Sequence, residues 1–155
     1  MYRNVVVPLD GSALAECVLP HVETLIKGCQ VENLFFVRVV EPVREMVAVD
    51  DQVFSLQELD RLASSMVSDA EEYLRELLKR FKYDGVKTKW EVVRGRPAES
   101  IAEYATKVNA DLIVIATHGR SGVSRWVWGS VAARILRSSC VPVLMIRAPG
   151  CVPGM

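Results

Sequence analysis

Residues 111–135, DLIVIATHGRSGVSRWVWGSVAARI, decide the fold of this chain. The stretch begins with an apolar run at residues 112–116, passes through a segment that contains glycines, and continues at residues 131–137 with apolar residues at helical spacing. A short continuous apolar run between turn residues is typical of a strand that is buried on both faces. The stretch therefore predicts a strand, a glycine-containing loop and a helix, in that order.

The loop in this stretch has the chemistry of an anion site. Nine residues separate Gly119 from Gly129, arginines lie between them, and Ser130 stands where the helix begins. Backbone N–H groups at a helix N-terminus are unpaired and carry partial positive charge, and glycine lets an anion approach the main chain closely. The spacing matches neither the P-loop nor the Rossmann fingerprint. The loop suits a phosphate, although Ser130 could equally serve only as a helix cap.

The rest of the chain repeats this alternation of strand and helix. We expect strands at residues 5–8, 34–40, 86–93, 112–116 and 141–146, and helices at 13–27, 59–81, from 97 onward, and 131–137. Ser12 is a suitable cap for the first helix, in which Pro20 should cause a kink or a local opening. Residues 41–55 have no clear period and read as a long loop. The pattern predicts an α/β fold, an open five-stranded parallel sheet with helices on both faces.

Composition narrows the class of protein. The chain has 155 residues, of which 50% are hydrophobic and 25% charged, and its formal net charge is zero. We expect a single domain at residues 1–147 and a flexible tail at 148–155. No basic field favours nucleic acid, and no apolar run approaches the ~18 residues of a membrane span. The four cysteines form no C-x-x-C pair, so we expect free thiols in a soluble cytoplasmic protein.

Four segments together resemble the universal stress protein (UspA) family. The sequence Ala116-Thr117-His118-Gly119, nine residues, then Gly129-Ser130 resembles the G-x-x-G, nine residues, G-S/T pattern of its nucleotide-binding members. Residues 4–12 (NVVVPLDGS) are similar to the family's first strand and Pro-x-Asp turn, residues 95–97 (GRP) to the entry of its third helix, and residues 140–147 to its last strand. The resemblance covers nearly the whole chain.

The resemblance implies a strand order of 3-2-1-4-5 and an ATP site where that order reverses, between strands 1 and 4. A carboxylate at Asp10 can accept hydrogen bonds from ribose hydroxyls or from the adenine amino group, although Asp-Gly-Ser is also turn chemistry. Val39 matches the family position whose backbone meets the adenine edge. The implied ATP-binding residues are Pro8, Leu9, Asp10, Val39, Ala116, Thr117, Gly119, Arg120, Gly129, Ser130 and Val131.

Ala116 departs from the family pattern, which has glycine at this position. If the backbone there has a positive φ, alanine adds strain of about 1 kcal/mol. If the glycine makes room for the nucleotide, the methyl group narrows the site. If the residue merely ends the strand, alanine is harmless, and we favour this interpretation because the remainder of the motif is intact.

The resemblance favours a protein that binds ATP as a stress-response sensor or regulator, with little or no catalysis. Catalysis of phosphoryl transfer usually needs a positioned base, metal-holding carboxylates and a charge-neutralising lysine. This site lacks the lysine and any obvious second carboxylate, so Mg²⁺ would be held mainly by the nucleotide phosphates. Two alternatives remain: a slow ATP hydrolase on the same fold, or a protein-interaction module that binds no nucleotide.

The resemblance also implies a homodimer. The last strand, Val141 to Ile146, would lie at the sheet edge, where an unpaired apolar strand is an aggregation hazard. Antiparallel pairing with the same strand of a second copy removes that edge and gives a two-fold interface.

Overall fold

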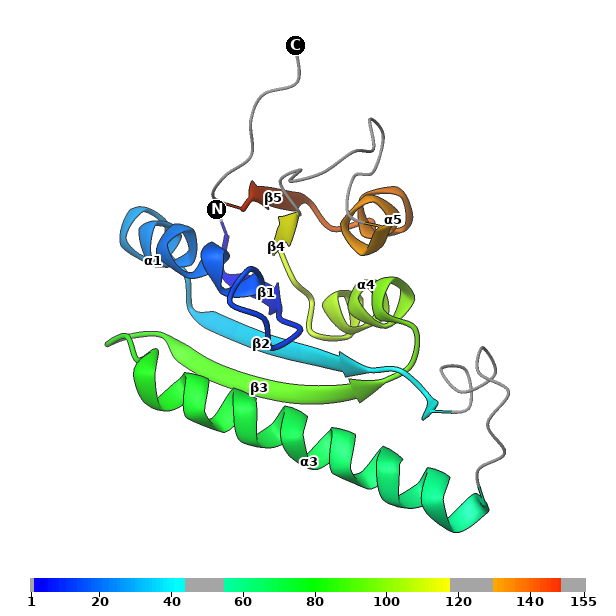
Figure 1. The fold of residues 1–155 in the computed structure, drawn as a ribbon. Coiled ribbons are helices and arrows are strands. Elements are labelled where there is room, and N and C mark those ends of the chain that lie inside the picture. The colour runs from blue at the N-terminus through cyan, green and yellow to red at the C-terminus, as the bar shows by residue number, and fades with distance from the viewer. Residues whose placement is uncertain (1, 44–54, 118–129, 149–155) are drawn as a thin grey trace.

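The computed structural model describes residues 2–43, 55–117 and 130–148. Five strands form one parallel sheet in the order β3-β2-β1-β4-β5. Their bounds are β1 Asn4–Pro8, β2 Asn33–Val40, β3 Lys87–Arg94, β4 Leu112–Thr117 and β5 Val143–Arg147. Both the fold class and the strand order that the sequence predicts are confirmed (Figure 1).

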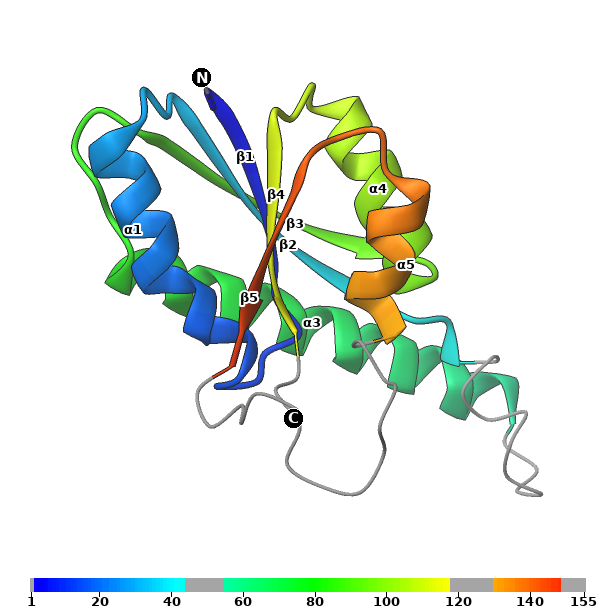
Figure 2. The same cartoon turned by 90° about the horizontal axis from the view of Figure 1, so that it is seen from above.

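Helices cover both faces of the sheet, as Figure 2 shows. Helices α1 (Leu19–Gly28) and α3 (Leu56–Arg80) pack on one face, and α4 (Pro97–Lys107) and α5 (Ser130–Ser138) pack on the other. Helix α3 begins with a capping box, in which Ser55 and Glu58 satisfy each other's backbone N–H groups. No helix among the described residues is long and apolar enough to cross a membrane.

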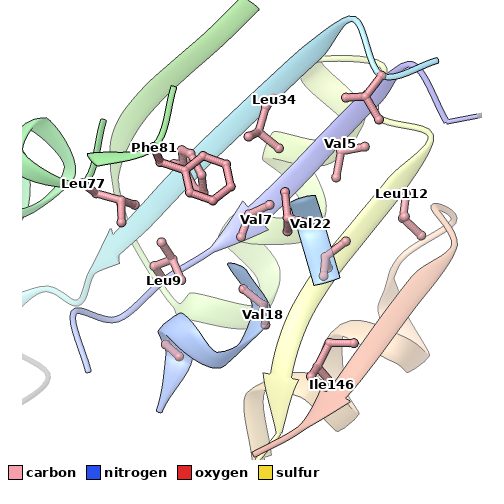
Figure 3. Packing of buried hydrophobic residues seen from close by; sticks show 14 of the residues in the cluster. Val5, Val7, Leu9, Val18, Val22, Leu34, Leu77, Phe81, Leu112 and Ile146 are labelled. Carbon is pink, nitrogen blue, oxygen red and sulfur yellow. The ribbon is translucent and has the colours of Figure 1, made fainter. Parts of the chain in front are cut away.

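Strand β1 lies at the centre of the sheet and divides the core into two clusters. Val5 and Val7 contribute to the cluster under α1 and α3, which Figure 3 shows, whereas Val6 contributes to the cluster under α4 and α5. All three side chains are at most 1% exposed. Successive side chains of a strand point to opposite faces, so a strand covered on both sides must be apolar throughout.

The first helix begins later than the sequence predicts. The Ser12 hydroxyl accepts the N–H of Ala15 at 3.1 Å, but the chain first forms a 3-10 turn, η1 (Ala15–Val18), and α1 starts only at Leu19. Pro20 therefore lies in the first turn of α1, where its missing N–H is not needed. The proline thus stands at the start of the α-helix and not at a kink within it, and the local irregularity expected near Pro20 takes the form of the preceding 3-10 turn.

The last strand is shifted toward the C-terminus relative to the predicted range. Pro142 has no N–H to donate, although its carbonyl accepts the N–H of Ile113 at 2.9 Å, and β5 runs from Val143 to Arg147. Ala148, the first residue of the predicted tail, is buried and donates its N–H to the Thr117 carbonyl at 3.1 Å. Ala148 is thus fixed to the end of β4, and residues 149–155 of the predicted tail lie outside the described residues.

Polar side chains join the amino ends of β1, β2 and β4. One carboxylate oxygen of Asp111 accepts the N–H groups of Arg3 and Asn4, at 2.9 and 2.8 Å. The Asn4 side chain donates to the Asn109 carbonyl at 3.0 Å and accepts from the Asn33 side chain at 2.8 Å. These bonds fix the register of the three strands at this end.

Candidate functional site

The carboxyl ends of β1, β2 and β4 meet at one edge of the sheet. Strand β1 is paired with β2 on one side and with β4 on the other, although β2 follows it in the chain and β4 does not. This is the point at which the strand order reverses, and ligands of open parallel sheets bind beyond the strands there. The structure therefore places the predicted residues of the three strand ends at the same edge.

The turn after β1 presents Asp10. Pro8 ends the strand, and the buried Leu9 donates its N–H to the Val37 carbonyl at 2.9 Å, which anchors the start of the turn on β2. Asp10 is exposed, and its Oδ1 accepts the N–H of Ser12 at 2.8 Å. Within the described ranges no hydrogen bond engages Oδ2, so this oxygen is oriented but available to a ligand.

Gly11 has a φ of +90°, in the region that favours glycine. The predicted turn chemistry of Asp-Gly-Ser is thus confirmed. It does not compete with a ligand role for Asp10, because the turn uses one carboxylate oxygen and leaves the other.

Val39 and Val131 lie on the opposite face of the sheet from α1 and α3. Val39 is the penultimate residue of β2, and its half-buried side chain packs against the cluster under α4 and α5. Val131, in the first turn of α5, packs against the same cluster. Ser130 is the first residue of α5 and is exposed. The start of α5 and the end of β2 thus border one cluster.

Ala116 sits in regular strand geometry. It pairs with Ile146 of β5, its half-buried side chain packs toward α1, and Asn109 is the one non-glycine residue with a positive φ in the part that the structure describes. Alanine at this position therefore carries no left-handed strain. Thr117 follows as the last, buried residue of β4. Three further predicted residues, Gly119, Arg120 and Gly129, lie outside the described residues.

An arginine that the sequence analysis did not single out borders the Asp10 turn. Arg38 lies in β2 on the same face as Phe36, with its Cζ 5.3 Å from the centroid of the Tyr73 ring on α3. Its guanidinium also lies against Gly11. A signal was present in the sequence, because Arg38 is the one charged residue in the otherwise apolar run of residues 34–40 (LFFVRVV).

Tyr73 connects this arginine to η1. Its hydroxyl donates to Glu16 Oε1 at 3.0 Å, and Arg80 Nη2 lies 3.3 Å from the same oxygen. Burial, together with the hydrogen bond to the Glu16 carboxylate, raises the pKa of Tyr73 well above its ordinary value. The phenol therefore keeps its proton and remains a donor across the physiological range.

Groups that bind a metal ion and reactive cysteines are two further kinds of site to consider among the described residues. No three His, Cys, Asp or Glu side chains gather there as a metal-binding group. Cys17, Cys29 and Cys140 are free, as expected, and burial raises the pKa of the Cys17 thiol. A raised pKa lowers the thiolate fraction and with it the reactivity of the sulfur.

Comparison with known proteins agrees with this architecture. The model of the universal stress protein family matches residues 1–147. Universal stress protein MJ0531 of Methanocaldococcus jannaschii is 30% identical over 149 residues, covering 96% of this chain and 84% of that protein.

Solved structures share the fold over nearly the whole chain. The hypothetical protein MJ0577, also from M. jannaschii, superposes with a TM-score of 0.79 at 25% identity, covering 97% of this chain and 99% of that one. A universal stress protein in complex with cAMP gives 0.59 at 22% identity, covering 95% and 98%. An Arabidopsis thaliana family member with AMP bound gives 0.62 at 17% identity, covering 96% and 93%.

Proposed function

The chain belongs to the universal stress protein family, and we propose that it binds ATP with Mg²⁺ at the carboxyl ends of β1, β2 and β4. The observation that carries this proposal is the Asp10 turn. It holds a carboxylate exposed at the point where the strand order reverses, with one oxygen fixed by Ser12 and the other available. An oriented carboxylate there suits the paired hydroxyls of a ribose.

Two kinds of observation support a nucleotide as the ligand. The fold is shared with two structures described as complexes with cAMP and with AMP, both of which contain adenosine. Ala116 has ordinary strand geometry, so the one departure from the family's glycine pattern does not distort β4. The adenosine half would lie between the β1 turn and the backbone of Val39, as the family resemblance implies.

The phosphates would lie toward the start of α5. The amino end of that helix offers unpaired N–H groups and a favourable dipole, with Ser130 exposed at its first position and Val131 behind it. Gly119, Arg120 and Gly129 complete this part of the proposed site from the sequence. Mg²⁺ would be held by these phosphates, because it binds nucleotides through their phosphate oxygens and keeps several waters.

A protein of this kind would act as a sensor whose surface depends on bound ATP, with little or no hydrolysis.

We also propose a homodimer through β5. This strand is at the edge of the sheet, and Leu144 is 36% exposed on it. Light scattering at micromolar concentration tests the dimer, and a monomeric mass would contradict it.

Calorimetric titration of nucleotide-free protein with ATP and Mg²⁺ tests the proposed function. We expect micromolar binding that Gly129→Val abolishes and that Asp10→Ala weakens at least about tenfold, since a hydrogen bond to a charged group contributes about 1.5–3 kcal/mol. Asp84→Ala is the matched control, because Asp84 is exposed before Gly85 in a second Asp-Gly turn, which has a φ of +82°. It should bind as the unaltered protein does.

Parallel titrations with AMP and cAMP show how much affinity the outer phosphates contribute. Absence of heat with all three nucleotides at millimolar concentration, in a folded protein, would refute the proposed function. That result would favour the interaction module that needs no nucleotide.

A further inference from the structure

Arg38 is a charged residue for which the fold alone gives no obvious reason. It is half-buried in β2, and no carboxylate lies within ion-pair distance of it in the described ranges. Moving a charge out of water is costly unless other contacts compensate for the lost hydration. The contacts that Arg38 does make therefore indicate its purpose.

The guanidinium of Arg38 lies close both to an aromatic ring and to the backbone of a glycine. Its Cζ is 5.3 Å from the centroid of the Tyr73 ring, within the range of a cation–π contact. In addition, a Cβ placed on Gly11 would lie 3.1 Å from Cζ and from Nη1, and 3.2 Å from Nη2. Near-equal distances to three guanidinium atoms mean that the flat face of the group covers Gly11.

The same contacts continue around the turn. Tyr73 donates its hydroxyl proton to Glu16, which lies in η1 directly after the turn, and the N–H of Glu16 donates to the Ser12 carbonyl at 3.3 Å. Arg80 holds Glu16 from α3. The turn is thus held at Gly11 by Arg38 and at its far end by Glu16, and both meet on Tyr73.

We propose that Arg38 is a positioning residue for the nucleotide site, which packs on both Gly11 and Tyr73 and so fixes the direction in which Asp10 presents its carboxylate. The inference rests on the proposed function and names a part of its specificity. Glycine has access to backbone conformations on both sides of φ = 0, so an uncovered Gly11 would leave the turn free to reorient. Arg38 touches the turn, and its effect on the ligand passes through Asp10.

The test compares ATP with 2′,3′-dideoxy-ATP, which lacks both ribose hydroxyls. We expect the protein to prefer ATP, and Asp10→Ala to abolish the preference. Arg38→Gln should reduce the preference about fivefold, a coupling typical of residues in contact. The double variant should be no worse than Asp10→Ala alone, because Arg38 acts through Asp10.

Lys89→Gln is the matched control. Lys89 makes a similar cation–aromatic contact, with its Nζ 5.6 Å from the Phe35 ring centroid, but on the other face of the sheet and away from the turn. It should leave the preference for ATP unchanged. A preference in Arg38→Gln equal to that of the unaltered protein would overturn the proposal.

Hydrogen exchange of the nucleotide-free protein separates this inference from the proposed function. The Ser12 amide, which donates to Asp10, should exchange faster in Arg38→Gln, while the Asn4 amide, which donates to Asp111, should not. If neither ATP nor 2′,3′-dideoxy-ATP binds the unaltered protein, the proposed function fails. Hydrogen exchange then decides by itself whether Arg38 positions the Asp10 turn. Unchanged Ser12 exchange would then overturn it. If Arg38→Gln does not fold, Tyr73→Leu, which removes the ring under the guanidinium, takes its place.

Discussion

The two ends of the parallel strands are built in opposite ways. At the amino end, the side chains of Asp111, Asn4 and Asn33 form hydrogen bonds with the backbone and side chains of neighbouring strands and connections. At the carboxyl end, Asp10 uses one oxygen on its own turn and leaves the other exposed. Both ends carry an aspartate beside β1, but Asp111 is half-buried and bonds to Arg3 and Asn4 across the sheet, whereas Asp10 is exposed and bonds within its own turn.

The difference separates a strand end whose polar side chains fix the register from one whose carboxylate we propose to bind a ligand. The Asp111 carboxylate binds the N–H groups of the residues that begin β1, so its removal should be felt as lost stability. The Asp10 carboxylate binds only Ser12, two residues away, so it adds little to the joining of strands. Substitutions at the two ends should therefore separate stability from affinity.

Asp111→Ala should give the largest loss of stability. It leaves the exposed N–H of Arg3 and the partly buried N–H of Asn4 without an acceptor, and we expect the free energy of unfolding to fall by about 1.5–3 kcal/mol. Urea denaturation measures this. ATP affinity of the folded fraction should not change, and Asp111→Asn, which keeps an acceptor oxygen, should lose less. A loss in Asp111→Ala no greater than in Asp84→Ala would contradict the role of the amino end.

Gly11→Ala should give the second largest loss of stability, and Gly85→Ala is the variant with which it is compared. Both glycines have a positive φ, +90° and +82°, so alanine at either should cost about 1 kcal/mol. At Gly85 the new methyl would meet nothing within 4 Å, whereas at Gly11 it would press on the Arg38 guanidinium. We expect Gly11→Ala to be the more destabilising by urea denaturation and the only one of the two to weaken ATP binding. Equal losses in both respects would show that Arg38 simply moves aside.

The smallest effect concerns pH and the start of α3, which follows the carboxyl end of β2. Hydrogen bonds from the Ser55 side chain and backbone hold the pKa of Glu58 below its ordinary value. A lowered pKa in the folded state contributes stability above the unfolded pKa, and this contribution is lost as pH falls through the folded pKa.

Glu58→Ala should therefore flatten the acid side of the stability profile below about pH 5, with no effect on ATP binding at neutral pH. Urea midpoints across the acid range measure it, with Glu103→Ala, an exposed glutamate of α4, as control. Parallel acid profiles for the unaltered protein and Glu58→Ala would refute the role of the cap.

Regular elements with simple burial were predictable from the sequence. The run at Val5–Val7 could only be a strand covered on both faces, and the turn at Asp10 followed from Asp-Gly-Ser. Contacts between distant residues were not predictable, because nothing local links Arg38 with Tyr73 or Asp111 with Asn4. Pro20 and Pro142 were misjudged for a different reason, since a proline's effect depends on which N–H the structure needs. In the proposed site, the residues at the strand ends were predicted through the family resemblance, whereas Arg38 was found only in the structure.

The pairing of β1 with β4 has a consequence for how the chain reaches its fold. Asn4 and Asp111, which join these strands, are 107 positions apart, although β1 precedes the other described elements in the chain and lies at the centre of the sheet. During synthesis β1 can pair early with β2, but its other edge must wait until most of the chain has emerged. Long-range parallel pairing of this kind slows folding and exposes apolar strands in the meantime. Nascent chains arrested before β4 should therefore be the species most dependent on chaperones.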